Sequence, residues 1–261
     1  MTRILSSIVL IPVVVGGIWF APHWGLVVLV EAVLVAAFVE YAGLVERTGT
    51  PIPRVVAGAS AAVVCAAVAW PGVSADLMLI AVFVAASTAV LAAYQPAPHV
   101  PATAAAAVFP ALYLGLPLGT IAAIRGAYGR EVLLLALLVV WVSDTAQYYA
   151  GTSFGKHRLS PTISPKKSVE GAIGGFVAGV AVMVGLGRVW LPQFGLAWLA
   201  GIGAVLVALG IAGDLFESLL KRSAHVKDSS GLIPGHGGVL DRVDSLLFVA
   251  PGYYLLLKLL P

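Results

Sequence analysis

The stretch that decides the fold runs from Leu196 to Leu220 and reads LAWLAGIGAVLVALGIAGDLFESLL. It contains no charged residue before Asp214. About 20 apolar residues are enough to cross the hydrocarbon core of a bilayer as a helix. The stretch therefore predicts a membrane-spanning helix with Asp214, Glu217 and Ser218 near its end.

Apolar runs of similar length fill most of the remaining chain. The sequence of 261 residues is 60% hydrophobic and only 10% charged, whereas an average soluble domain is about 25% charged. So few charges could not cover a soluble surface, and we predict an all-α, polytopic membrane bundle of about nine transmembrane helices. The other expected spans are Ile4–Phe20, Leu26–Leu44, Val55–Trp70, Leu77–Tyr94, Ala102–Ile124, Val132–Ala150, Gly171–Leu191 and Ser245–Leu260.

No shift in composition marks a separate soluble domain. We expect one membrane domain over 1–261, with N-terminal helices in 1–131 and catalytic helices and cytosolic loops in 132–261. The first run lacks a small-residue cleavage site, which favours a retained helix over a signal peptide. The lone cysteine, Cys65, lies in an apolar run and is expected to be a buried, inert thiol.

The positions of Lys and Arg orient the bundle, because these residues concentrate in cytosolic loops. With the N-terminus inside, all of them fall on the cytosolic side except Arg125, Arg130, Arg188 and Lys258. Arg125 and Arg130 are the local exceptions to the pattern. The two long polar segments, 151–170 and 221–244, then face the cytosol, and a bacterial inner membrane is the simplest location.

The end of the deciding stretch carries the first candidate site residues. Asp214, Ser218, Lys221 and Arg222 have the spacing i, i+4, i+7 and i+8, so they share one face of a helix. A carboxylate at membrane depth is costly and is a functional candidate by default. For Lys221 and Arg222 the alternative is simple snorkelling to lipid head groups.

The segment that follows combines glycines, cations and carboxylates. After Lys227 and Asp228 come Gly231 to Gly238 with His236 among them, and then Asp241, Arg242 and Asp244. Glycines let backbone amides surround an anion, and carboxylates beside such a loop suit Mg²⁺ carrying a polyphosphate. The alternative is a solvated loop followed by a capped helix.

The other polar segment is strongly basic. Lys156, Arg158, Lys166 and Lys167 precede the expected start of a helix, which favours binding of an anion. Contact with anionic lipid is the rival interpretation. Upstream, Asp144 lies within an expected span, where a ligand or ion-pair role is favoured.

Two further features remain open at this level. Gly171, Gly175 and Gly179 form a stripe of small residues that suits close helix packing, either within the chain or in a homodimer. Glu31 and Glu40 lie in the second apolar run as candidates for buried ion pairs, and the sequence indicates no specific role for them.

The segment from Ser218 to Asp244 resembles the phosphatidate cytidylyltransferase family, whose pattern is S-x-x-K-R-x4-K-D followed by H-G-G-x-x-D-R-x-D. Asp144 and the segment Ser164–Lys167 are similar to further family features. The resemblance implies transfer of CMP from CTP to phosphatidic acid, forming CDP-diacylglycerol and pyrophosphate at the bilayer, with Mg²⁺ as cofactor.

The resemblance also assigns roles to residues. It implies Asp214 and Asp241 as metal ligands, to which we add Asp144 as a candidate, and it leaves open a second, monovalent cation. The predicted catalytic residues are Asp214, Ser218, Lys221, Asp241 and Asp244. The predicted substrate-binding residues are Lys166, Lys167, Arg222, Lys227, His236, Gly237, Gly238 and Arg242.

The residue types suit a reaction without a covalent enzyme intermediate. A phosphate monoester has a second pKa of about 6 and needs no general base near neutral pH. We therefore expect direct attack on the α-phosphorus, with His236 as the alternative nucleophile or acid.

Other functions stay open from the sequence. A CTP-dependent polyprenol or lipid kinase has a similar C-terminal region, and an ion-coupled transporter also contains intramembrane carboxylates. A structural membrane scaffold would have no use for Asp144 and Asp214. No nucleic-acid partner is expected.

Overall fold

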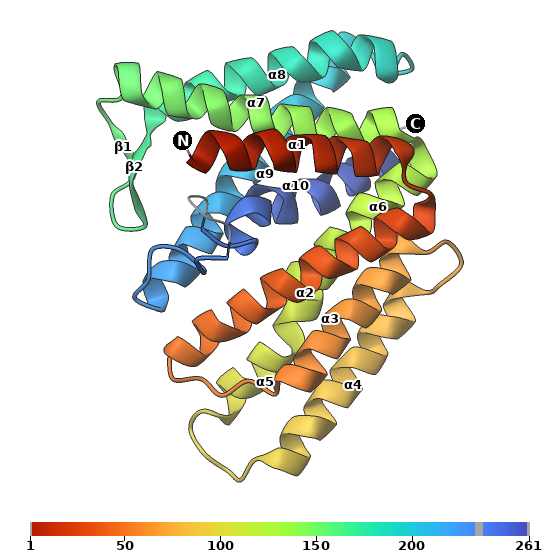
Figure 1. Cartoon of the computed structure of the whole chain (residues 1–261), viewed down its shortest axis with the longest axis vertical. Helices are drawn as coiled ribbons and strands as arrows, with labels where there is room; N and C mark the ends of the chain where they lie inside the picture. Colours follow the sequence, from red (N-terminus) through yellow and green to blue (C-terminus); the bar gives the residue numbers. More distant parts are fainter. Residues whose placement is uncertain (1, 233–236, 260–261) are drawn as a thin grey trace. The chain divides into compact units, whose positions relative to one another are not determined.

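The computed structural model describes residues 2–232 and 237–259 (Figure 1). Every apolar run predicted from the sequence is helical, because a backbone in lipid must satisfy its own hydrogen bonds. The helices and strands are α1 (Thr2–Phe20), α2 (His23–Arg47), α3 (Arg54–Ala69), α4 (Ala75–Ala93), α5 (Val100–Pro110), η1 (Ala111–Gly115), α6 (Leu116–Tyr128), α7 (Arg130–Phe154), β1 (Arg158–Ser160), β2 (Ser164–Ser168), α8 (Val169–Trp190), α9 (Leu196–Ser223) and α10 (Leu240–Leu259).

Within the described residues, six helical segments are long and apolar enough to cross a membrane. They are His23–Arg47, Ala75–Ala93, Val100–Tyr128, Arg130–Phe154, Val169–Trp190 and Leu196–Ser223. Helix α3 is apolar but has only 16 residues. The chain is therefore an all-α, polytopic membrane protein, as its composition predicts.

The chain packs as two compact units. The first comprises Met1–Gly126 and Leu220–Val243, and the second comprises Ala127–Leu219 and Asp244–Pro261. In the first unit, α3 packs against α2, α4, α5 and η1. Cys65 on α3 is buried with a free thiol, which confirms its predicted burial. The prediction of one membrane domain stays a prediction.

The fifth expected span is not a uniform α-helix. Its central turn, η1, is a π-helix in which the Leu116 amide donates to the Ala111 carbonyl. Pro117 follows directly and has no amide hydrogen to donate to Tyr113, whose carbonyl its ring would crowd in an α-helix. A widened turn relieves this crowding, and the apolar pattern alone gave no sign of it.

Gly115, at the end of η1, sets how closely this span approaches α3. A Cβ atom at Gly115 would collide with the Ala61 carbonyl oxygen of α3. We expect Gly115→Ala to destabilise the protein by about 1–3 kcal/mol, since backbone atoms cannot move aside as a side chain can. Thermal unfolding in detergent measures the effect. The matched control is Gly43→Ala on α2, where nothing lies within 4 Å, and an equal loss in both variants would contradict the prediction.

Arg125, an exception in the charge pattern, has a structural role in the first unit. Its Nε donates to the Ile18 carbonyl at 2.8 Å, and its Nη2 donates to the Ala21 carbonyl. The last carbonyls of α1 have no partner within the helix and carry the negative end of its dipole. Arg125 therefore caps α1, which explains a basic residue at a position where the topology rule disfavours one.

The second unit is organised by close packing of α7 and α8, which lie side by side in Figure 1. Gly171, Gly175 and Gly179 are buried on α8. A Cβ atom at Gly171 would lie 2.8 Å from the Gln147 carbonyl of α7, and one at Gly175 would collide with the Gln147 side chain. The glycine stripe therefore packs inside the chain, which is the first of the two interpretations of its spacing.

The basic segment between α7 and α8 forms a small antiparallel hairpin of β1 and β2, with Arg158 opposite Ser168. Its base is fixed by Glu170, which accepts hydrogen bonds from the Lys156 and His157 amides at 3.0 and 3.2 Å and lies 2.6 Å from His157 Nδ1. Ser168 caps α8 by accepting from the Gly171 amide at 3.1 Å. These contacts hold the basic strand β2 at the start of α8.

Candidate active site

Helix α9 ends in a hydrogen-bonded reversal that begins the last loop. The Val226 amide donates to the Lys221 carbonyl at 2.9 Å, and the His225 amide donates to the Arg222 carbonyl at 3.0 Å. His225 adopts a left-handed conformation with φ of 56°. This is the Schellman arrangement that ends many helices, with His at the position usually occupied by glycine. Arg222 adds a bond from Nη1 to the Val226 carbonyl at 2.8 Å.

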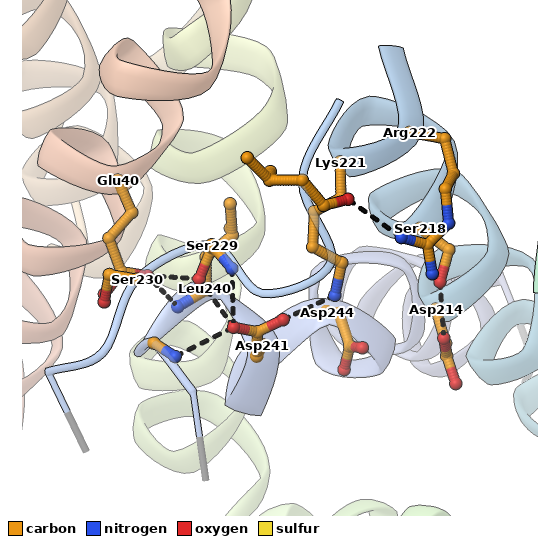
Figure 2. Close-up of polar contacts among 12 residues, drawn as sticks. Glu40, Asp214, Ser218, Lys221, Arg222, Ser229, Ser230, Leu240, Asp241 and Asp244 are labelled. Atoms are coloured by element: carbon orange, nitrogen blue, oxygen red, sulfur yellow. Dashed lines mark hydrogen bonds and ion pairs between the residues drawn. The ribbon is translucent and has the colours of Figure 1, made fainter. Parts of the chain in front are cut away.

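Asp241 is the centre of a cluster in the first unit (Figure 2). Its Oδ1 pairs with the Lys221 ammonium. Its Oδ2 accepts from the Ser229 amide at 2.9 Å, the Ser229 hydroxyl at 2.7 Å and the Gly238 amide at 2.8 Å. The two paired side chains are 11% and 6% exposed, so the ion pair is buried.

The ionisation of Asp241 follows from these contacts. Burial alone would raise the pKa of Asp241, but the donated hydrogen bonds, led by that of the Lys221 ammonium, lower it to about 2. The carboxyl group is therefore charged at neutral pH. A fixed negative charge beside a lysine suits a site that handles metal-bound phosphates.

Glu40 on α2 is the second carboxylate of this cluster. It accepts hydrogen bonds from the hydroxyls of Ser229 and Ser230 at 2.9 and 2.6 Å, and from the amides of Val239 and Leu240 at 3.0 and 2.8 Å. It is only 7% exposed. The sequence indicated Glu40 only as a candidate for a buried ion pair; the donors described here are hydroxyls and amides, which lie too far along the chain to be inferred.

At Gly238, the last glycine of the predicted phosphate-binding turn, the backbone amide donates to a carboxylate of the protein itself. Gly237 has φ of 77°, and the Gly238 amide points at Asp241. A Cβ atom at Gly238 would collide with the carboxylate of Glu40 and the hydroxyl of Ser229. The prediction that Gly237 and Gly238 contact substrate stays a prediction.

A second cluster lies in the second unit and contains Asp214. Lys167 Nζ from the hairpin is 2.5 Å from Asp214 Oδ2, and the Ser218 hydroxyl is 3.4 Å from Oδ1. A Cβ atom at Gly213 would lie 2.5 Å from the Asp244 carbonyl oxygen, so the missing side chain lets α10 approach α9 here. The structure thus brings together Lys167, Asp214 and Ser218, three of the predicted residues.

Two other predicted carboxylates accept hydrogen bonds from residues close to them in the sequence. Asp144 accepts from Gln147 Nε2 at 3.1 Å on α7, and Asp244 accepts from the neighbouring Ser245 amide at 2.7 Å. Four predicted cations are exposed: Lys166, Arg222, Lys227 and Arg242. His236 lies outside the described residues.

Ser229 and Ser230 are site residues that the sequence analysis did not select. A serine in a polar loop is common, so its residue type alone did not indicate a role in the site.

Comparison with known proteins bears on these clusters. The profile described as "Cytidylyltransferase family" matches residues 1–260. The phosphatidate cytidylyltransferase of Bacillus subtilis is 42% identical over 151 residues, which cover 57% of this chain and 56% of that protein. That of Thermotoga maritima is 42% identical over 139 residues, or 51% of each chain. That of Staphylococcus aureus is 45% identical over 125 residues, or 47% of each chain.

The chain thus spans about half the length of the curated relatives that it matches. The family profile, in contrast, covers nearly every residue, including the helices that carry both clusters. The chain belongs to the cytidylyltransferase family.

Proposed function

We propose that the chain is a CTP:phosphatidate cytidylyltransferase, which joins CMP to phosphatidate and releases pyrophosphate. One observation carries the proposal: the buried pair of Lys221 and Asp241 joins the two halves of the family pattern in a charged cluster. The names of the relatives support the same reaction. No observation favours a kinase or a transporter.

The clusters contain ligands of the type that Mg²⁺ prefers. Mg²⁺ in phosphate-transferring sites takes one or two carboxylates and leaves its other positions to phosphates and water. Asp214 and Asp241 offer such oxygens, and no group of three His, Cys, Asp or Glu side chains occurs within residues 2–232 and 237–259. We propose each of these two carboxylates as a candidate ligand of Mg²⁺, Asp241 in the first unit and Asp214 in the second, with Asp144 of the second unit as a further candidate. Bound Mg²⁺ would neutralise charge on the phosphates.

The lysines then have a defined task. Lys221 and Lys167 now pair with carboxylates, and in the proposed complex their ammonium groups face phosphate oxygens. Arg222 and Lys227 supply further positive charge. These cations bring the two anionic substrates together, which is the main barrier when both reactants are phosphates.

The proposed chemical step is a direct displacement. A phosphatidate oxygen attacks the α-phosphorus of CTP, and a new phosphorus–oxygen bond forms. The bond from the α-phosphorus to the oxygen bridging to the β-phosphorus breaks, and its electron pair leaves with pyrophosphate. The nucleophile is already deprotonated near neutral pH, so no side chain has to remove a proton or form a covalent bond.

The proposal places the site at the cytosolic face of a bacterial inner membrane. Phosphatidate is a component of the bilayer, while CTP is dissolved in the cytosol. The basic hairpin and the loop after α9 lie at the ends of apolar helices, where a polar head group and a nucleotide could both be reached.

The purified protein in mild detergent should convert phosphatidate, CTP and Mg²⁺ into equal amounts of CDP-diacylglycerol and pyrophosphate. With a chiral α-thiophosphate of CTP, direct displacement should invert the configuration at phosphorus, because a single in-line step reverses it. Release of CDP would indicate a kinase instead. Retention of configuration would disprove direct attack, and absence of products from folded protein would overturn the proposed function.

A further inference from the structure

Glu40 is the one carboxylate of the first unit's cluster that the proposed mechanism does not use. It lies on α2, close to the end of that helix at Arg47. All four groups that donate to it belong to the segment before and at the start of α10 (Figure 2). These donors are two serine hydroxyls and two backbone amides, and one of the amides is the first of α10.

The two oxygens of Glu40 join the two sides of the last loop. Oε1 accepts from Ser230 and from the Val239 amide. Oε2 accepts from Ser229 and from the Leu240 amide. The first amides of a helix have no partner within it, and Glu40 provides one from a different helix. The carboxylate therefore fixes where α10 begins.

Glu40 is linked to Asp241 through one hydroxyl. Ser229 Oγ lies 2.9 Å from Glu40 Oε2 and 2.7 Å from Asp241 Oδ2. A hydroxyl has a single proton to donate, so the Ser229 hydroxyl shares that proton between the two carboxylates. The position of the Ser229 side chain therefore depends on both Glu40 and Asp241. A Cβ atom at Gly238 would collide with Glu40 and with Ser229 Oγ, and the Gly238 amide donates to Asp241. A shift of Glu40 would therefore be transmitted to Asp241 through Ser229 and Gly238.

We propose that Glu40 is a positioning residue of this enzyme, which holds residues 229–230 and 239–240 so that Asp241 and Lys221 keep their places. The catalytic consequence rests on the proposed function, whereas the effect on the loop does not. Glu40 acts through the loop and does not touch the reacting phosphates.

The test is Glu40→Gln, with hydrogen–deuterium exchange and kinetics measured on the full chain in nanodiscs. Loss of a charged acceptor should speed exchange of the Val239 and Leu240 amides by about 10–100-fold. The value of kcat should fall by about 10–100-fold, while KM for CTP changes far less. The matched control is Glu46→Gln on the same helix, whose 41% exposed carboxylate pairs with Arg54 at 2.6 Å. It should change neither quantity.

Ser230→Ala keeps the test decisive if Glu40→Gln unfolds the whole protein. It removes one donor to Glu40 from the loop side and should speed local exchange without affecting α3 and α4. If Glu40→Gln unfolds the protein, unchanged exchange of the Val239 and Leu240 amides in Ser230→Ala would overturn the proposal. If Glu40→Gln stays folded, the effect of Ser230→Ala should largely vanish in the double variant, because the two residues act through one contact. Fully additive effects would count against the proposal.

The outcomes separate the two proposals. If Glu40→Gln lowers kcat but leaves exchange at Val239 and Leu240 unchanged, Glu40 does not act through the loop and the inference is wrong. If exchange rises but kcat is unchanged, the positioning role in the reaction is also wrong. If the wild type forms no CDP-diacylglycerol, the proposed function fails, and the exchange result alone decides whether Glu40 orders the loop.

Discussion

Replacing Asp241 by Asn is expected to lower the rate of CDP-diacylglycerol formation by about 1,000-fold. The variant removes the negative charge that the Lys221 ammonium, the Ser229 hydroxyl and two backbone amides now surround. It would also remove a proposed ligand of Mg²⁺. Initial rates of product formation at saturating CTP and phosphatidate measure the effect.

The same change should also cost stability. Removing one partner of a buried ion pair costs about 3–5 kcal/mol, because the other charge stays buried. The double variant Lys221→Met/Asp241→Asn should recover part of this stability but none of the activity. Asp76→Asn is the control, since that exposed carboxylate at the start of α4 bonds to the neighbouring Ser74 hydroxyl. If the double variant regained activity, Asp241 would be a structural residue only.

Asp214 should show the second-largest effect. Asp214→Asn is expected to lower the rate by about 100–1,000-fold, because the amide would bind Mg²⁺ and pair with Lys167 more weakly than the carboxylate at 2.5 Å does. Asp214→Glu keeps the charge but moves it by roughly one methylene, and displacement of about 1 Å can cost 100-fold. Product formation over a range of Mg²⁺ concentrations measures both variants.

The two Asp214 variants should respond differently to the metal. If Asp214 binds Mg²⁺, excess Mg²⁺ should restore part of the activity of Asp214→Glu and little of that of Asp214→Asn. Asp214 is 31% exposed as a side chain, so neither variant should unfold the protein. A wild-type rate in Asp214→Asn would remove this residue from the site, and equal rescue of both variants would remove its role in metal binding.

The sequence predicted those parts of the structure that depend on local patterns. Each apolar run forms a helix because a helix pairs all backbone N–H and C=O groups within one segment, as lipid requires. Helix α9 carries Asp214 and Lys221, and both meet charged partners as expected of costly groups at membrane depth. The helical spacing of the glycines on α8 likewise indicated a close contact, which the structure confirms.

The sequence could not predict features that depend on distant or competing partners. Ser229 and Leu240 meet Glu40 across 189 and 200 positions, and no periodicity connects them. The glycine turn was interpreted as a phosphate-binding turn, which stays a prediction, and spacing could not show that the Gly238 amide donates to the carboxylate of Asp241. The π-helical turn before Pro117 arises from a missing amide hydrogen and neighbouring packing, which hydropathy does not report.

The link between Glu40 and the start of α10 also has a consequence for biosynthesis. The ribosome adds residues at about 5–20 per second, so roughly 10–40 seconds separate the synthesis of Glu40 from that of its last donor, 200 positions later. During this interval α2 must be inserted while water or head groups solvate its carboxylate. The translocation machinery therefore handles a helix whose carboxylate receives its hydrogen bonds from the protein only after residues 229–240 have been synthesised, so the site cannot mature before that point.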